Sequence, residues 1–203
     1  MELTRITSLW LWCRFYTQFI FTYAYTISLI YIWKALDSKH NAVAGIIVAL
    51  IGAVICHIAG KDSVRQFVGR YCTWLIILAG TIDATTELFL LIDPFTKLLG
   101  DVIAGPITFQ IFRVMISERK NVIFIDPDDR ALFETSMEKF SLAATMLGCL
   151  GVLLYEVSIQ TTVYLSVFGN FLSVTLVLWR FRVIDKYIIR NRLKVSKALA
   201  HLY

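Results

Sequence analysis

Two acidic residues interrupt an otherwise apolar stretch, GTIDATTELFLLIDP, that covers residues 80–94. Asp83 and Glu87 are four residues apart, so in a helix their side chains lie on one face and repel each other. In a membrane, each acid near the helix centre costs about 2.5–3.5 kcal/mol, whereas a strongly apolar residue favours insertion by only about 0.3–0.6 kcal/mol. A membrane span built on this stretch therefore needs a neighbouring helix, a proton or water to accommodate the pair.

The sequence after this stretch offers such a neighbouring helix. Asp93 and Pro94 predict a tight turn, after which the next apolar segment can return antiparallel to the first. Folding about residue 95 would place a third acid, Asp101, near the height of Phe89. Lys97 lies four residues before Asp101 and can pair with it.

A break in the returning helix adds polar groups to this hairpin. Gly105 and Pro106 fall near the depth of Asp83, and the proline frees a backbone carbonyl that protein or water must satisfy. Many transporters bind cations or protons where acidic groups face a broken helix. The ion-handling candidates are Asp83, Glu87, Asp101 and Gln110. In the alternative interpretation the acids are neutral or hydrogen-bonded to Gln110, Thr81, Thr85 and Thr86, and serve only to fix helix packing.

The composition places these helices in a membrane. Of 203 residues, 58% are hydrophobic and 17% charged, against about 45–50% and 25% in soluble domains. The apolar residues form runs of the roughly 20 residues that cross a bilayer, without the alternation of a transmembrane barrel. We therefore predict an all-α, polytopic helical bundle. Its six candidate spans are residues 15–33, 42–59, 74–92, 98–116, 140–155 and 157–179, and a four-span alternative leaves the third and fourth out of the membrane.

The basic residues predict the orientation of the chain. With six spans and both termini in the cytoplasm, only Lys34, Lys39 and Lys97 of the 20 Lys and Arg residues fall outside. The first apolar run is too long for a signal-peptide core, so we expect it to remain as a span. The expected organisation is a membrane domain over 1–179, with a cytoplasmic loop at about 117–139, and a cytoplasmic tail over 180–203. We expect the protein in the inner, cytoplasmic membrane.

The cytoplasmic loop contains a helix-start signal. Asp126 fits the capping position, Pro127 the first helical position, and Asp128 and Asp129 the first turn. The fifth span is short, so we expect its helix to begin in this loop. The two acids lack the glycine and the terminal glutamate of a calcium loop, and we therefore assign them to capping, with no metal.

Small residues recur at helical spacing on two of the spans. Such residues let helices approach closely in lipid, either within one chain or against a partner helix. They are Gly45, Ala49, Gly52 and Ala53 in the second span and Ala144, Gly148 and Gly151 in the fifth.

The tail is basic and amphipathic. Ile184 and Ile188 begin an apolar seam that a helix lying on the membrane would turn toward lipid. We expect contact with anionic inner-leaflet lipids, and self-association through the seam is the alternative. The basic residues assigned to this lipid surface are Arg182, Lys186, Arg190, Arg192, Lys194 and Lys197.

The function expected from these features is contact with other membrane components, as in assembly, immunity or exclusion factors, through a membrane protein partner or a second copy. The alternative is a channel, or a cation- or proton-coupled carrier, that uses the acids of the hairpin. An intramembrane aspartyl protease is disfavoured because Leu98 occupies the first glycine position of its Gly-x-Gly-Asp motif. No nucleophile, zinc or phosphate-binding motif is present, so we expect no enzyme and no cofactor. Membrane topology accounts for the basic residues, so we expect no nucleic-acid partner.

Overall fold

The structure, a computed structural model, describes residues 2–35, 62–92, 119–150 and 158–191, and isolated positions between them: 43, 46, 47, 50–54, 57, 58, 96, 97, 100, 101, 105, 116, 117 and 153. The four long helices are α1 (Glu2–Ala35), α3 (Asp62–Phe89), α5 (Pro127–Cys149) and α7 (Ile159–Arg190). Every regular element in the described part is helical, which confirms the all-α prediction.

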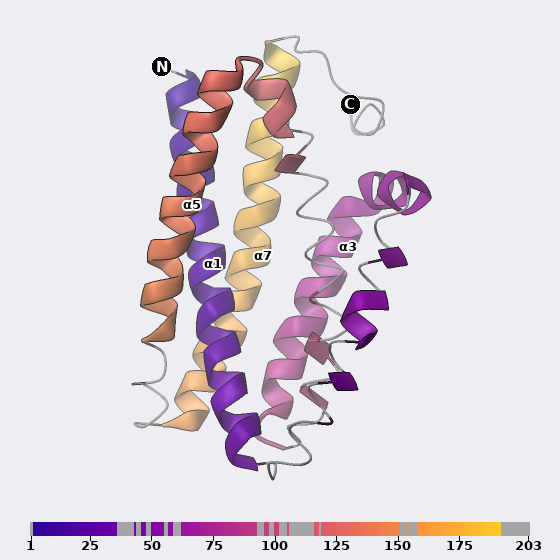
Figure 1. Cartoon of the computed structure of the whole chain (residues 1–203), viewed down its shortest axis with the longest axis vertical. Helices are drawn as coiled ribbons and strands as arrows, with labels where there is room; N and C mark the ends of the chain where they lie inside the picture. Colours follow the sequence, from indigo (N-terminus) through magenta and orange to yellow (C-terminus); the bar gives the residue numbers. More distant parts are fainter. Residues whose placement is uncertain are drawn as a thin grey trace.

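Helices α1, α5 and α7 form the long side of the molecule, and α3 packs against α7 (Figure 1). Helices α1 and α5 run parallel, because Arg14 Nε donates to Ser141 Oγ at 3.1 Å and Gln18 Nε2 donates to Thr145 Oγ1 at 3.3 Å. Both pairs are separated by the same number of residues, 127. Helix α7 runs in the opposite direction beside them.

Glycines allow close approach at each of these helix interfaces. A Cβ at Gly148 of α5 would lie 2.9 Å from the carbonyl oxygen of Phe19 on α1. A Cβ at Gly169 of α7 would lie 2.6 Å from Ile20 Cδ1, also on α1. Gly80 of α3 meets Val174 of α7 in the same way. At Gly148 the crowding atoms include backbone of α1, so a larger residue would push α1 and α5 apart; at Gly169 and Gly80 they are side-chain atoms of Ile20 and Val174.

The start of α5 is the one that the sequence predicts. Asp126 Oδ1 accepts a hydrogen bond from the Asp128 N–H at 2.9 Å, and Pro127 occupies the first helical position. The helix then continues without interruption to Cys149, so the helix that contains predicted span 140–155 does begin earlier, at Pro127. Ser158 caps α7 by accepting from the Thr161 N–H at 3.3 Å.

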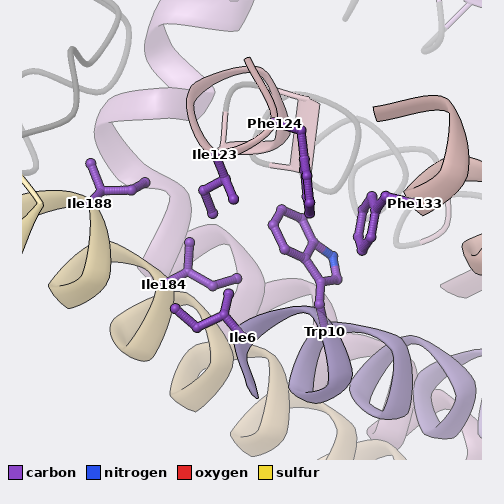
Figure 2. Close-up of a cluster of buried hydrophobic side chains, with 7 residues drawn as sticks. All are labelled: Ile6, Trp10, Ile123, Phe124, Phe133, Ile184 and Ile188. Carbon is purple, nitrogen blue, oxygen red and sulfur yellow. The ribbon is translucent and has the colours of Figure 1, made fainter. Parts of the chain in front are cut away.

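Seven buried apolar side chains form a core at the end of the bundle that holds the N-terminus (Figure 2). Phe124 and Phe133 stack with their centroids 4.5 Å apart, and Trp10 meets Phe133 edge-on at 5.2 Å. Ile184 and Ile188, which begin the apolar seam of the tail, lie in this core instead of facing lipid. The residues just before α5 cover the seam. The cluster comprises Ile6, Trp10, Ile123, Phe124, Phe133, Ile184 and Ile188.

Two buried arginines lie beside this core. Arg119 makes a bidentate ion pair with Asp185, at 2.7 Å from Nε and 2.8 Å from Nη2, and its guanidinium lies 4.4 Å from the Phe181 ring centroid. Arg180 lies over Phe181 and Trp10 at 4.9 and 5.9 Å. Its Nε and Nη2 atoms have no hydrogen-bond partner within the described part of the chain.

Away from the end of the bundle that holds the N-terminus, the outward faces of the helices carry mainly apolar side chains. Among the described helices, α7 is the one that is long and apolar enough to cross a membrane by itself. Exposed charged side chains concentrate at the end of the bundle that holds the N-terminus, although Ile125, Leu132 and Ile189 are also exposed there. The outward apolar side chains below that end include Phe21, Tyr25 and Leu29 on α1, Trp74 and Leu78 on α3, Leu142 and Met146 on α5, and Phe168 and Phe171 on α7.

Candidate functional site

The acidic residues of the hairpin meet around one lysine. Asp83 and Glu87 lie one turn apart near the end of α3, and the chain then turns through residues 90–92. The described residues 96, 97, 100 and 101 are again helical. Lys97 and Asp101, one turn apart on this returning segment, point back at α3. We call Asp83, Glu87, Lys97 and Asp101 the hairpin cluster.

Lys97 is shared by all three carboxylates. Its Nζ lies 2.9 Å from Glu87 Oε1 and 3.8 Å from Asp83 Oδ1, and it also forms an ion pair with Asp101. Lys97 and Glu87 are 2% and 1% exposed, whereas Asp83 and Asp101 are 33% and 29% exposed. The cluster therefore has a buried ion pair at its centre and two partly open carboxylates at its edge.

The negative charge of the hairpin cluster exceeds its positive charge. Three carboxylates face one ammonium, so full ionisation leaves two negative charges without a cation inside the cluster. Neither carboxylate oxygen of Glu87 has a hydrogen bond of good geometry with a described residue, although Lys97 Nζ is close enough for an ion pair. A buried acceptor in this state needs a donor, such as water or a proton of its own.

The threonines of α3 do not hydrogen-bond to the carboxylates. Thr85 Oγ1 donates to the Thr81 carbonyl, and Thr86 Oγ1 donates to the Asp83 carbonyl at 3.0 Å. The Thr85 and Thr86 hydroxyls therefore do not hold the acids, and Lys97 is the described side chain that pairs with them. Gln110, the other donor of the alternative interpretation, lies outside the described residues.

The two arms of the hairpin pair about one turn deeper than the sequence suggests. A Cβ at Gly100 would collide with the Thr86 side chain, so these two residues lie opposite each other. Asp101 is then level with the middle of the acidic stretch and not with Phe89. This pairing differs by about one turn from the expected one, and the shift lets Lys97 reach Glu87. Asp93 and Pro94, which predict the turn, lie outside the described residues.

Two hydroxyl groups interrupt the outward apolar face of α3. Thr81 and Thr85 are exposed one turn apart, on the side of the helix opposite to Asp83 and Glu87. Exposed apolar side chains flank them along α3, with Trp74, Ile77 and Leu78 before them and Leu88 after them. We call Thr81 and Thr85 the outer polar patch.

The remaining candidates of the hairpin are only partly described. Gln110 and Pro106 lie outside the described residues. A Cβ added at Gly105 would have no described atom within 4 Å. Among the described residues, no group of three or more His, Cys, Asp or Glu side chains is placed to hold a metal ion.

The small residues divide between packed and open positions. Ala144 is fully buried and Gly148 packs against α1, so both lie in the interface between α1 and α5. Gly52 has no described neighbour within 4 Å of a Cβ, and Ala53 is exposed. Gly45, Ala49 and Gly151 lie outside the described residues.

The basic residues of the tail are described as far as the end of α7. Arg182, Lys186 and Arg190 are exposed on α7. Arg192, Lys194 and Lys197 lie outside the described residues. Sequence reasoning missed the Arg119–Asp185 pair and the glycines at 80 and 100, because each depends on contacts between segments far apart in the chain.

Comparison of the chain with family models, with curated proteins and with solved structures gives no match. The function must therefore be inferred from the arrangement of these residues alone.

Proposed function

We propose that the chain is a multi-pass protein of the inner membrane with both termini in the cytoplasm. The outward apolar faces of all four long helices support this placement, since lipid is the solvent that such faces need. Trp12 and Trp179 are exposed at similar heights on α1 and α7, where an aromatic belt would mark the inner boundary. From Trp179 to Ile159, α7 rises about 30 Å, the thickness of the hydrocarbon core.

Six spans fit the packing better than four. The four-span alternative removes α3 and the returning helix from the membrane. However, Gly80 of α3 packs against Val174 in the apolar part of α7. If α7 crosses the bilayer, α3 lies beside it at the same depth, and the hairpin is inside the membrane with it.

We infer that the protein acts through contact with other membrane components, as assembly, immunity or exclusion factors do. The outer polar patch carries this inference. Exposed threonines among lipid-facing side chains are residues through which helices associate in lipid, since they are small and their hydroxyls can hydrogen-bond to another helix. A partner helix, from another protein or a second copy, would pack there. Gly52 and Ala53 are further small residues without close described neighbours or with an exposed surface.

A second candidate, a cation- or proton-coupled carrier, is favoured by the charge of the hairpin cluster. Three carboxylates around one lysine leave negative charge that a proton or a monovalent cation can neutralise. In this case the partly open carboxylates of Asp83 and Asp101 face water. The protease alternative gains no support, because Lys97 contacts both aspartates and a catalytic aspartate pair must share a proton.

Accessibility of the outer polar patch tests the contact function. Thr85→Cys in a cysteine-free chain is treated with an impermeant maleimide in intact cells, and Leu147→Cys, on an outward apolar face, is the matched control. The contact function predicts that the thiol introduced at position 85 is protected, and that this protection is lost when the protein is purified away from its partner. Rapid labelling of that thiol in the cell would instead show that this face of α3 is open to water and would contradict the contact function.

Flux measurements test the carrier directly. The purified protein is reconstituted in vesicles with a pH or cation readout, and Asp83→Asn, Glu87→Gln and the double variant are compared. The carrier predicts flux in the unmodified protein and its loss in the double variant. Flux that survives both substitutions, or no flux in the unmodified protein, removes this candidate.

A further inference from the structure

A groove of about 330 Å³ lies on the seam between α1 and α7, close to the end of the bundle that holds the N-terminus. It is separate from the hairpin cluster, and none of its lining residues is acidic. The residues that line it are Arg5, Ile6 and Leu9 from α1 and Trp179, Val183, Lys186, Tyr187 and Arg190 from α7.

Apolar and basic groups are separated along this groove. On α7, Trp179 and Val183 come first, and Lys186 and Arg190 follow about 10 and 16 Å further along the helix than Trp179. Because α1 runs in the opposite direction, Leu9 lies toward the apolar end and Arg5 toward the basic end. The groove is therefore an amphipathic slot with a hydrophobic floor at one end and positive charge at the other.

The height of the groove matches this polarity. Trp179 lies at the proposed inner boundary of the membrane, together with Trp12. The apolar end of the groove is then level with the acyl chains, and the basic end is level with the lipid headgroups. Exposed Arg5 and Lys186 side chains at that height attract anionic headgroups.

We propose that this groove binds one anionic phospholipid of the inner leaflet. Its phosphate lies between Arg5 and Lys186, and the start of an acyl chain packs on Leu9 and Val183. The proposal rests on the membrane placement above and makes it more specific. It differs from the diffuse attraction of a basic tail to a charged surface, because it requires one lipid per chain and depends on the shape of the groove.

A lipid titration tests this binding. Dihexanoyl phosphatidylglycerol and dihexanoyl phosphatidylcholine are titrated into the full-length protein in neutral detergent, and native mass spectrometry counts the bound lipids. We expect saturation at one phosphatidylglycerol per chain, with at least ten-fold tighter binding than phosphatidylcholine. Arg5→Gln combined with Lys186→Gln should weaken that binding at least ten-fold. Lys120→Gln combined with Lys139→Gln, the same charge change at sites outside the groove, should not.

Two further arms identify the source of the phosphate and the role of the groove's shape. Inorganic phosphate should bind at least ten-fold more weakly than phosphatidylglycerol, and equal binding would overturn the lipid assignment in favour of a free anion. Val183→Trp keeps every charge but fills the apolar floor, and it should also weaken lipid binding. Equal losses in the groove pair and the control pair would reduce the effect to general electrostatics and overturn the proposal.

The lipid site and the membrane placement can fail separately. Circular dichroism of each variant checks that it is folded. If Val183→Trp does not fold, the comparison of the Arg5→Gln, Lys186→Gln variant with its control decides the outcome. Labelling of the hairpin turn tests the spans, whereas the titration tests the groove. Phosphatidylglycerol binding that is absent in a chain shown to span the membrane contradicts this inference alone.

Discussion

At the scale of single residues, Lys97 occupies the position beside Glu87 that water or a bound cation would otherwise fill. Both side chains are almost fully buried, so neither recovers its hydration if the other is lost. Breaking a buried ion pair by removing one partner typically costs about 3–5 kcal/mol. The effect of a substitution in the hairpin cluster should therefore depend on whether it removes the cation or one of the acids.

Lys97→Met is expected to lower the free energy of unfolding by about 3–5 kcal/mol, because it leaves Glu87 buried beside two other carboxylates. Glu87→Gln should cost clearly less, since Lys97 keeps Asp83 and Asp101 as partners. Unfolding in mixed micelles, followed by circular dichroism during titration with dodecyl sulfate, compares the two. Equal losses would show that the lysine is not the centre of the cluster.

The two buried arginines should respond in opposite ways to the same substitution. Arg180→Met is expected to leave stability unchanged or raise it by up to about 4 kcal/mol, because two of its buried nitrogens have no described hydrogen-bond partner. Arg119→Met should lower stability by about 1.5–3 kcal/mol, since Asp185 loses its bidentate partner. The same unfolding measurement applies. A large loss on Arg180→Met would mean that the arginine has a partner essential to the fold.

Sequence reasoning placed the three acids of the hairpin near one another and predicted the pair of Lys97 with Asp101, which the structure confirms, but it did not bring Lys97 to Glu87 and Asp83. Helical spacing puts Asp83 and Glu87 on one face, and the expected turn brings Asp101 close to them. Which residues meet across the hairpin depends on a shift of about one turn, which is set by the contact of Gly100 with Thr86. The sequence of either segment alone does not predict that Gly100 packs against Thr86.

At the scale of the helices, glycines determine how closely α1, α3, α5 and α7 approach. Interfaces in lipid lack the hydrophobic driving force of water and depend on close contact between helix backbones. Gly148, Gly169 and Gly80 each lie where a Cβ would be too close to the neighbouring helix. Gly52 differs from these three, because no described neighbour crowds it.

Gly148→Ala should therefore lower the free energy of unfolding by about 1–3 kcal/mol, because the new methyl group collides with the Phe19 backbone and with Thr22. Gly52→Ala is the matched control, in which alanine should raise helix stability by up to about 1 kcal/mol. The two variants are compared by unfolding in micelles. If Gly148→Ala is as well tolerated as Gly52→Ala, close approach of α1 and α5 is not required.

Helix starts were predictable, whereas the surroundings of the last helix were not. The run from Asp126 to Asp129 carries its capping chemistry within four residues, so α5 begins where expected. Ile184 and Ile188 show a seam that could face lipid, a partner or a core, since all three are apolar environments. The seam lies in a core because Ile123 and Phe124, from a segment about 60 residues earlier in the chain, cover it.

At the scale of the whole molecule, the bundle has two parts of different character. One end has a conventional core around Trp10 and Phe133, with exposed charged side chains. The rest turns large apolar side chains outward, and its interior holds apolar side chains such as Ile27 and Val163 as well as polar ones such as Ser166 and Asn170. So much outward apolar surface is stable in lipid and costly in water.

The side of the membrane on which the hairpin turn lies tests this placement most directly. Ile92 is 79% exposed just after α3, and Asp128 is exposed at the start of α5. In a chain whose native cysteines (Cys13, Cys56, Cys72 and Cys149) are replaced, Ile92→Cys and Asp128→Cys are treated with an impermeant maleimide in intact cells. We predict that the Ile92→Cys variant is labelled at once and the Asp128→Cys variant only after lysis. If neither variant is labelled until lysis, the hairpin does not cross the bilayer, and the proposed membrane architecture is wrong.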